Sequence, residues 1–117
     1  MEPYQIHAIL QILAFLSFLN GVYYAKKHTI RMHHYFIFIA VGLTTVAIIY
    51  MIHITGGVSS THGKVGILIY FYVLFTALSG KAFLMRKISR KQHQYLAIIA
   101  ILLIILQILI GTYTFIL

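Results

Sequence analysis

Histidines are the residues of this chain best suited to chemistry, and four of the seven follow a pattern. His7, His33, His62 and His93 each lie near the start of a separate apolar stretch. An ionisable side chain at membrane depth is costly and usually marks a functional site. Imidazole is also the commonest metal ligand in proteins. The chain has no cysteine, which excludes iron–sulfur clusters, thiolate-ligated metals and covalently attached haem.

The composition indicates a membrane protein. Hydrophobic residues make up 62% of the 117 residues and charged residues only 9%, with a mean hydropathy of +0.97. Too few polar residues remain to cover a globule in water, so lipid must surround most of the chain. The net charge of +8 comes from short segments between apolar stretches, so we expect no nucleic-acid partner.

The four apolar stretches predict four transmembrane helices. Each has about 20 residues or more, enough to cross a hydrocarbon core of about 30 Å. Lipid permits only helices or closed barrels, and no stretch shows the strict alternation of a barrel strand. We place the helices at about residues 4–26, 32–54, 62–85 and 93–117, with Ser60 or Thr61 capping the third. The expected fold is a single all-α domain, an integral membrane four-helix bundle running up-down-up-down.

Eight of the nine basic residues fall on one side of this arrangement. They lie near or after the ends of the first and third helices, and only Lys64 lies on the opposite side. The eight residues are Lys26, Lys27, Arg31, Lys81, Arg86, Lys87, Arg90 and Lys91. The positive-inside rule then makes both basic loops cytoplasmic and puts both termini outside.

Antiparallel helices convert the order of the histidines into depth. His7 and His62 begin helices that start outside, so they lie level near the outer face. His93 and either His33 or His34 lie level near the inner face. In a square bundle each of these levels joins diagonal helices, and two such imidazoles can ligate a haem iron from both sides. The sequence therefore predicts two bis-histidine b-type haems.

Helical periodicity distinguishes His33 from His34. Residues at +4, +7, +11, +14 and +18 share a helix face with the starting residue. The faces are Gln11, Ala14, Phe18, Gly21 and Ala25 after His7; Ile37, Ala40, Thr44, Ala47 and Met51 after His33; Gly66, Ile69, Val73, Thr76 and Gly80 after His62; and Ala97, Ala100, Ile104, Gln107 and Gly111 after His93. Small residues are frequent on these faces. They also line ordinary membrane-helix interfaces, but here they would make room for a flat macrocycle.

The face that follows His34 is bulky and looks lipid-facing, so His33 is the preferred ligand. His53 lies about 200° around the helix from His33 and does not share its face. His28 falls in the first basic loop. Two other interpretations remain: interfacial histidines that extend to water, and a zinc or copper site. A zinc or copper site is disfavoured because neither a carboxylate nor a closely spaced histidine pair supplements the imidazoles.

The arrangement resembles the core of the cytochrome b561 family, which carries four histidines on four consecutive helices. Ser60-Thr61-His62-Gly63 is similar to the family's Ser-Leu-His-Ser, and His53 is similar to its additional outer histidine. The resemblance covers nearly the whole chain, although family members usually have six helices. If the second helix is aligned with the family on Gly42, His28 takes the ligand position in place of His33. The depth of His28 and the helical periodicity disfavour this alignment.

The resemblance implies a transmembrane oxidoreductase with His7 and His62 on an outer haem, and His33 and His93 on an inner one. Electrons would pass from an ascorbate-like or other small anionic donor in the cytoplasm to ferric iron or monodehydroascorbate outside. His53 would lie near the outer acceptor. The residues implied near the donor are Lys27, Arg31, Arg86, Lys87, Arg90 and Lys91. Iron with two imidazoles has no open position, so no residue is assigned a catalytic role.

Other functions are compatible with the sequence. The chain could be a membrane anchor subunit of a larger redox complex, with or without haem, or a small transporter or scaffold. The absence of buried carboxylates and of proline-broken helices disfavours transport. Expected partners are membrane lipid and the electron donor and acceptor, and a homodimer is compatible with the sequence.

Overall fold

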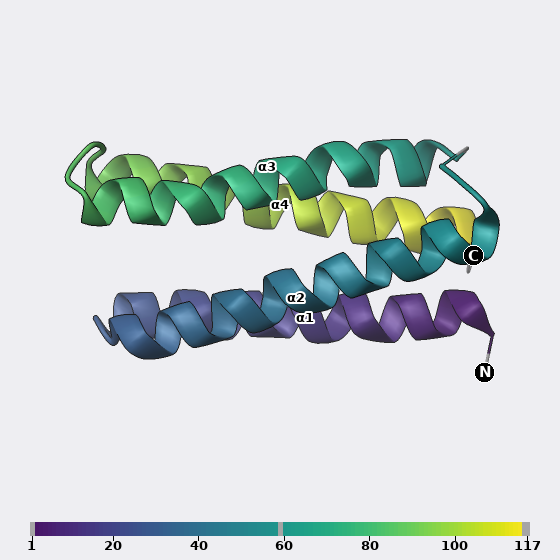
Figure 1. Cartoon of the computed structure of the whole chain (residues 1–117), viewed down its shortest axis with the longest axis horizontal. Coiled ribbons are helices and arrows are strands. Elements are labelled where there is room, and N and C mark those ends of the chain that lie inside the picture. Colours follow the sequence, from purple (N-terminus) through teal and green to yellow (C-terminus); the bar gives the residue numbers. More distant parts are fainter. Residues whose placement is uncertain (1, 59, 116–117) are drawn as a thin grey trace. The chain divides into compact units, whose positions relative to one another are not determined.

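Four α-helices account for nearly all of the computed structural model, which describes residues 2–58 and 60–115. The helices are α1 (Pro3–Lys26), α2 (Ile30–Thr55), α3 (Thr61–Leu84) and α4 (Arg90–Phe115) (Figure 1). The predicted all-α fold with four helices is confirmed. The largest difference in the described ends is at α4, which begins at Arg90 rather than at His93. The predicted end of that helix, at residue 117, lies outside the described residues.

Each helix is long and apolar enough to cross a membrane, as expected of a multi-pass membrane protein. Lipid leaves main-chain N–H and C=O groups no partner except one another, and a helix satisfies them all within one segment. This requirement explains why β-branched stretches such as the isoleucine-rich α4 are helical despite their modest helix propensity.

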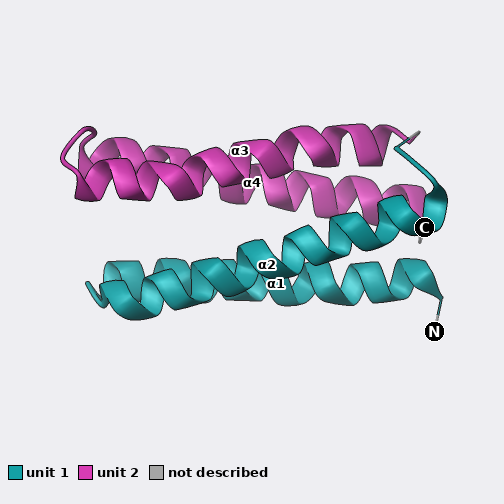
Figure 2. Ribbon diagram, viewed as in Figure 1, with its two compact units in different colours: residues 1–58 teal, residues 59–117 magenta. Residues whose placement is uncertain are grey.

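The chain divides into two compact units, Met1–Val58 and Ser59–Leu117 (Figure 2). Each unit is a pair of antiparallel helices joined by a short turn, α1 with α2 and α3 with α4. The single four-helix domain stays a prediction.

The helix ends carry recognisable caps. The Ser60 hydroxyl accepts a hydrogen bond of 3.0 Å from the Gly63 N–H, so Ser60 is the cap of α3. Before α4, the Gln92 N–H donates to Ser89 Oγ and the Ser89 N–H donates to Gln92 Oε1, which forms a capping box. Helix α2 is followed by the C-cap residue Gly56, whose φ of 76° is left-handed and suits glycine.

In the α1–α2 pair, the buried residues between the helices are small, with the exception of Phe18. The buried residues are Ala14, Phe18, Gly21, Ala40 and Ala47. All five lie on the faces that follow His7 and His33 in the sequence. Ala40 and Ala47 are 0% exposed. The faces that were predicted to make room for a haem therefore form the interface of this pair, which is the ordinary role of small residues in membrane helices.

The α3–α4 pair follows the same rule with one addition. Its buried residues are Ile69, Val73, Thr76, Ser79 and Ala100. All but Ser79 lie on the faces that follow His62 and His93. The large side chains of Leu68, Phe71 and Phe75 are exposed on α3, a surface suited to lipid.

Candidate functional site

In the α1–α2 pair, two histidines connect the helices at opposite ends. His7 Nδ1 lies 3.1 Å from the main-chain oxygen of Ala47, and His33 Nδ1 lies 2.8 Å from that of Gly21. A carbonyl oxygen can only accept a hydrogen bond, so each imidazole carries its proton on Nδ1. In a neutral imidazole the lone pair is then on Nε2.

Gly21 brings α2 close to α1 beside His33. A Cβ at Gly21 would lie 2.8 Å from Ile37 Cδ1 and 3.6 Å from the main-chain oxygen of His33. Any larger residue would therefore press on α2 at the turn that carries His33. The missing side chain allows the short hydrogen bond from His33 Nδ1 to the Gly21 oxygen.

In the α3–α4 pair, His93 lies against the last turns of α3. Its Nδ1 is 2.7 Å from Ser79 Oγ, and Ser79 Oγ donates to the Thr76 carbonyl at 2.5 Å. A Cβ at Gly80 would lie 3.3 Å from His93 Cε1, so the imidazole covers the surface of that glycine. The Phe83 ring is parallel to the imidazole within 4°, with the ring centres 6.3 Å apart. These contacts hold the ring of His93 in one orientation.

His62 is held differently at the other end of the same pair. A Cβ at Gly111 would lie 2.7 Å from His62 Cε1, so the imidazole occupies the space that a side chain there would fill. Gln107 Nε2 donates to the His62 main-chain oxygen at 2.7 Å and lies 3.5 Å from His62 Nε2. The Phe115 ring meets the imidazole edge to face, with centres 5.6 Å apart.

The four contacts follow one reciprocal rule. On each helix, a small residue lies 14 or 18 positions after the histidine and on the same face. This small residue contacts the histidine of the paired helix. His7 meets Ala47 and His33 meets Gly21; His62 meets Gly111 and His93 meets Gly80. The sequence predicted that these small residues make room for a macrocycle. In the structure, they receive imidazole rings and the paired helix.

The remaining histidines lie elsewhere. His33 is half-buried. His34 is exposed beside Tyr35 and Phe38, and the Phe38 side chain is 75% exposed. This difference in exposure agrees with the helical periodicity, and the choice of His33 as the ligand stays a prediction. His53 is exposed in the last turn of α2, and His28 is exposed in the α1–α2 turn with a left-handed φ of 58°.

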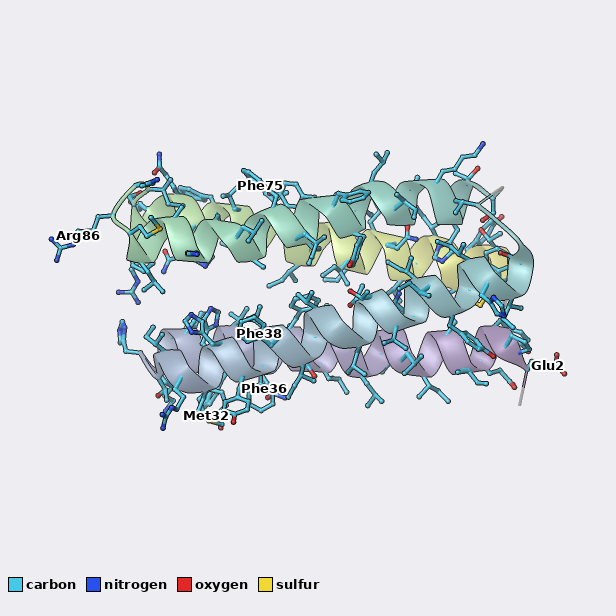
Figure 3. The ribbon with its side chains drawn as sticks, in the orientation of Figure 1. Glu2, Met32, Phe36, Phe38, Phe75 and Arg86 are labelled. Atoms are coloured by element: carbon cyan, nitrogen blue, oxygen red, sulfur yellow. The ribbon has the colours of Figure 1, made fainter. Side chains whose placement is uncertain are left out.

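Exposed basic residues lie at the end of each helical pair where the turn joins the two helices. Lys26, Lys27 and Arg31 are at the α1–α2 turn, and Lys81, Arg86, Lys87, Arg90 and Lys91 are at the α3–α4 turn. Figure 3 shows the Arg86 side chain extending outward from its turn. Lys27 Nζ lies 5.4 Å from the centre of the Tyr23 ring, a cation–π contact. Within each pair, the basic residues therefore lie at the end that also carries His33 or His93.

Sequence reasoning missed Ser79 and assigned no role to Gln107. Ser79 lies one residue before Gly80 and is not on the face that follows His62. The available signal was a serine inside an apolar helix, 14 residues before a histidine. Gln107 was on a predicted face, and a buried amide in lipid signals a specific hydrogen-bond partner.

A haem with two axial imidazoles would take one histidine from each helical pair. Both predicted ligand pairs, His7 with His62 and His33 with His93, therefore stay predictions. Within residues 2–58 and 60–115, no three histidine, aspartate or glutamate side chains lie close enough together to hold a metal ion. Each predicted ligand pair would supply two imidazoles, which are the ligands of a bis-histidine haem.

Comparison with known proteins found no family model, curated protein or solved structure that matches this chain.

Proposed function

We propose that this chain is a di-haem b-type cytochrome, similar to the cytochrome b561 family, that carries electrons across a membrane. The donor is a small anionic reductant such as ascorbate in the cytoplasm. The acceptor, on the outer side, is ferric iron or monodehydroascorbate. The outer haem uses His7 and His62, and the inner haem uses His33 and His93.

The observation that carries this proposal is the hydrogen bonding of His7 and His33. Each donates Nδ1–H to a main-chain carbonyl of the paired helix, at 3.1 and 2.8 Å. Metal-ligating histidines almost always donate their second ring N–H to a carbonyl, carboxylate or water, which leaves the other nitrogen for the metal. Histidines that merely extend to water at an interface have no need of such partners.

The chain's own residues would hold and insulate the cofactor. A bound haem supplies a one-electron carrier, which no side chain of this chain provides. The helices keep the imidazoles in fixed orientations, and the apolar side chains around them exclude water. The exposed basic residues at the turns attract an anionic donor toward the inner haem. His53, exposed at the opposite end of α2, contacts the acceptor.

The first test is the absorption spectrum of the purified chain with its haem-to-protein ratio. After expression with adequate haem, we expect two low-spin haems per chain. A colourless protein would refute the proposal. A single haem together with a co-purifying soluble subunit would instead favour a membrane anchor of a redox complex.

The second test concerns orientation in the membrane. Because the chain has no cysteine, single cysteines can be introduced and labelled without background. We expect Lys87→Cys, in the α3–α4 turn, to react with an impermeant maleimide only from the cytoplasmic side. Val58→Cys, after α2, should react only from outside. The reversed pattern would place the basic turns outside and contradict the proposed direction of electron flow.

A further inference from the structure

Ser79 supplies the hydrogen-bond partner of His93 Nδ1, which differs in kind from the partners of Nδ1 in His7 and His33. Those two imidazoles donate to main-chain oxygens, whereas His93 Nδ1 meets a side-chain hydroxyl at 2.7 Å. A main-chain carbonyl is present whatever residue occupies the position. A serine hydroxyl depends on one side chain, so substitution can remove it without altering the helix backbone.

The direction of the hydrogen bond follows from the neighbouring carbonyl. Ser79 Oγ lies 2.5 Å from the Thr76 main-chain oxygen, and two oxygens at that distance require a proton between them. The single hydroxyl proton of Ser79 therefore goes to Thr76, and its lone pair accepts the proton of His93 Nδ1. Ser79 and Thr76 are both 7% exposed, so water does not compete for these groups.

We propose that Ser79 is a positioning residue that fixes His93 in its Nδ1–H tautomer and lowers the potential of the haem bound there. The second half of this inference rests on the proposed function. A hydrogen bond from the distal ring nitrogen makes a histidine ligand more basic. A more basic ligand stabilises the ferric state, so the Ser79 side chain lowers the potential of the inner haem.

The test of the first half uses the full chain without haem. We expect 15N spectra of the imidazoles, at a pH where they are neutral, to show His93 as the Nδ1–H tautomer. Ser79→Ala should shift that signal toward the other tautomer, and Ser79→Thr, which keeps the hydroxyl, should restore it. His93→Gln assigns the signal.

Thr76→Val is the matched control. Thr76 is equally buried on the same helix, but its hydroxyl donates to the Tyr72 carbonyl at 3.1 Å and not to a histidine. This substitution preserves the shape of the side chain and keeps the Thr76 main-chain oxygen for Ser79. We expect the tautomer of His93 to be unchanged. An equal change in Ser79→Ala and Thr76→Val would reduce Ser79 to a packing role and overturn the inference.

The second half is tested on the haem-loaded chain by redox titration. Ser79→Ala should raise the potential of one of two haems and weaken its binding by about 10- to 100-fold, as for other residues that support a metal ligand. Thr76→Val should leave both potentials in place. If the tautomer responds but no haem binds, the proposed function fails while the positioning by Ser79 stands. If the tautomer does not respond, the inference is wrong whatever the cofactor.

Discussion

Replacing His33 with alanine is expected to reduce the haem content by about half, because a haem held by His33 and His93 would be bound weakly after the loss of one imidazole. Replacing its neighbour His34 should leave the haem content unchanged. His33 is half-buried and donates to the Gly21 carbonyl, whereas His34 lies about 100° around the helix and is exposed. Haem per chain and the absorption spectrum of the reduced protein measure the difference.

A packing defect must be separated from the loss of a ligand. His33→Ala also removes the hydrogen bond to α1, worth about 1 kcal/mol. His33→Gln retains a side-chain donor for the Gly21 carbonyl but supplies no haem ligand. We expect Ala and Gln at this position to lose the same haem. Retention of both haems by His33→Ala, with loss in His34→Ala, would show that the ligand face of α2 has been assigned incorrectly.

Replacing Gly111 with alanine is expected to displace the His62 imidazole and remove the outer haem. The added Cβ would lie 2.7 Å from Cε1, 3.1 Å from Nδ1 and 3.2 Å from Nε2 of His62, so the whole ring must move. Crowding of this kind costs about 1–3 kcal/mol. Haem content and thermal unfolding in detergent measure the two effects.

Gly42 offers the matched control for Gly111. It also lies within a helix, but an added Cβ there would meet nothing within 4 Å. Gly42→Ala should therefore keep both haems and be neutral or stabilising by up to about 1 kcal/mol, since alanine favours the helix over glycine. Gly80→Ala, with a closest approach of 3.3 Å to His93, should have an effect between those of Gly42→Ala and Gly111→Ala. Full haem occupancy in Gly111→Ala would mean that His62 need not keep its place against α4.

The helices and their inward faces could be predicted because each depends on nearest neighbours along the chain. A segment in lipid must satisfy its main-chain groups internally, so apolar length alone predicts a helix. The helical repeat then places His33 on the same face as Ala40 and Ala47, which the structure buries. The Ser60 cap was one of two adjacent candidates for the same local reason.

The partners of the histidines could not be predicted, because they depend on how far one helix slides along another. The offset between two helices is decided by close packing over their whole interface. No single spacing between residues in the sequence determines it. It brings His33 to the Gly21 oxygen, His93 to Ser79, and His62 to Gly111. Ser79 lies outside the predicted face, and it is buried where it meets His93 of α4.

By itself, therefore, the sequence determined four membrane-spanning helices and which face of each carries its histidine, since lipid and the helical repeat allow few alternatives. The tertiary structure decided what each imidazole contacts. Antiparallel pairing puts the histidine that begins one helix against the small residue near the end of the other. The imidazole protons of His7 and His33 are directed to main-chain oxygens by that contact, and the proton of His93 is directed to Ser79.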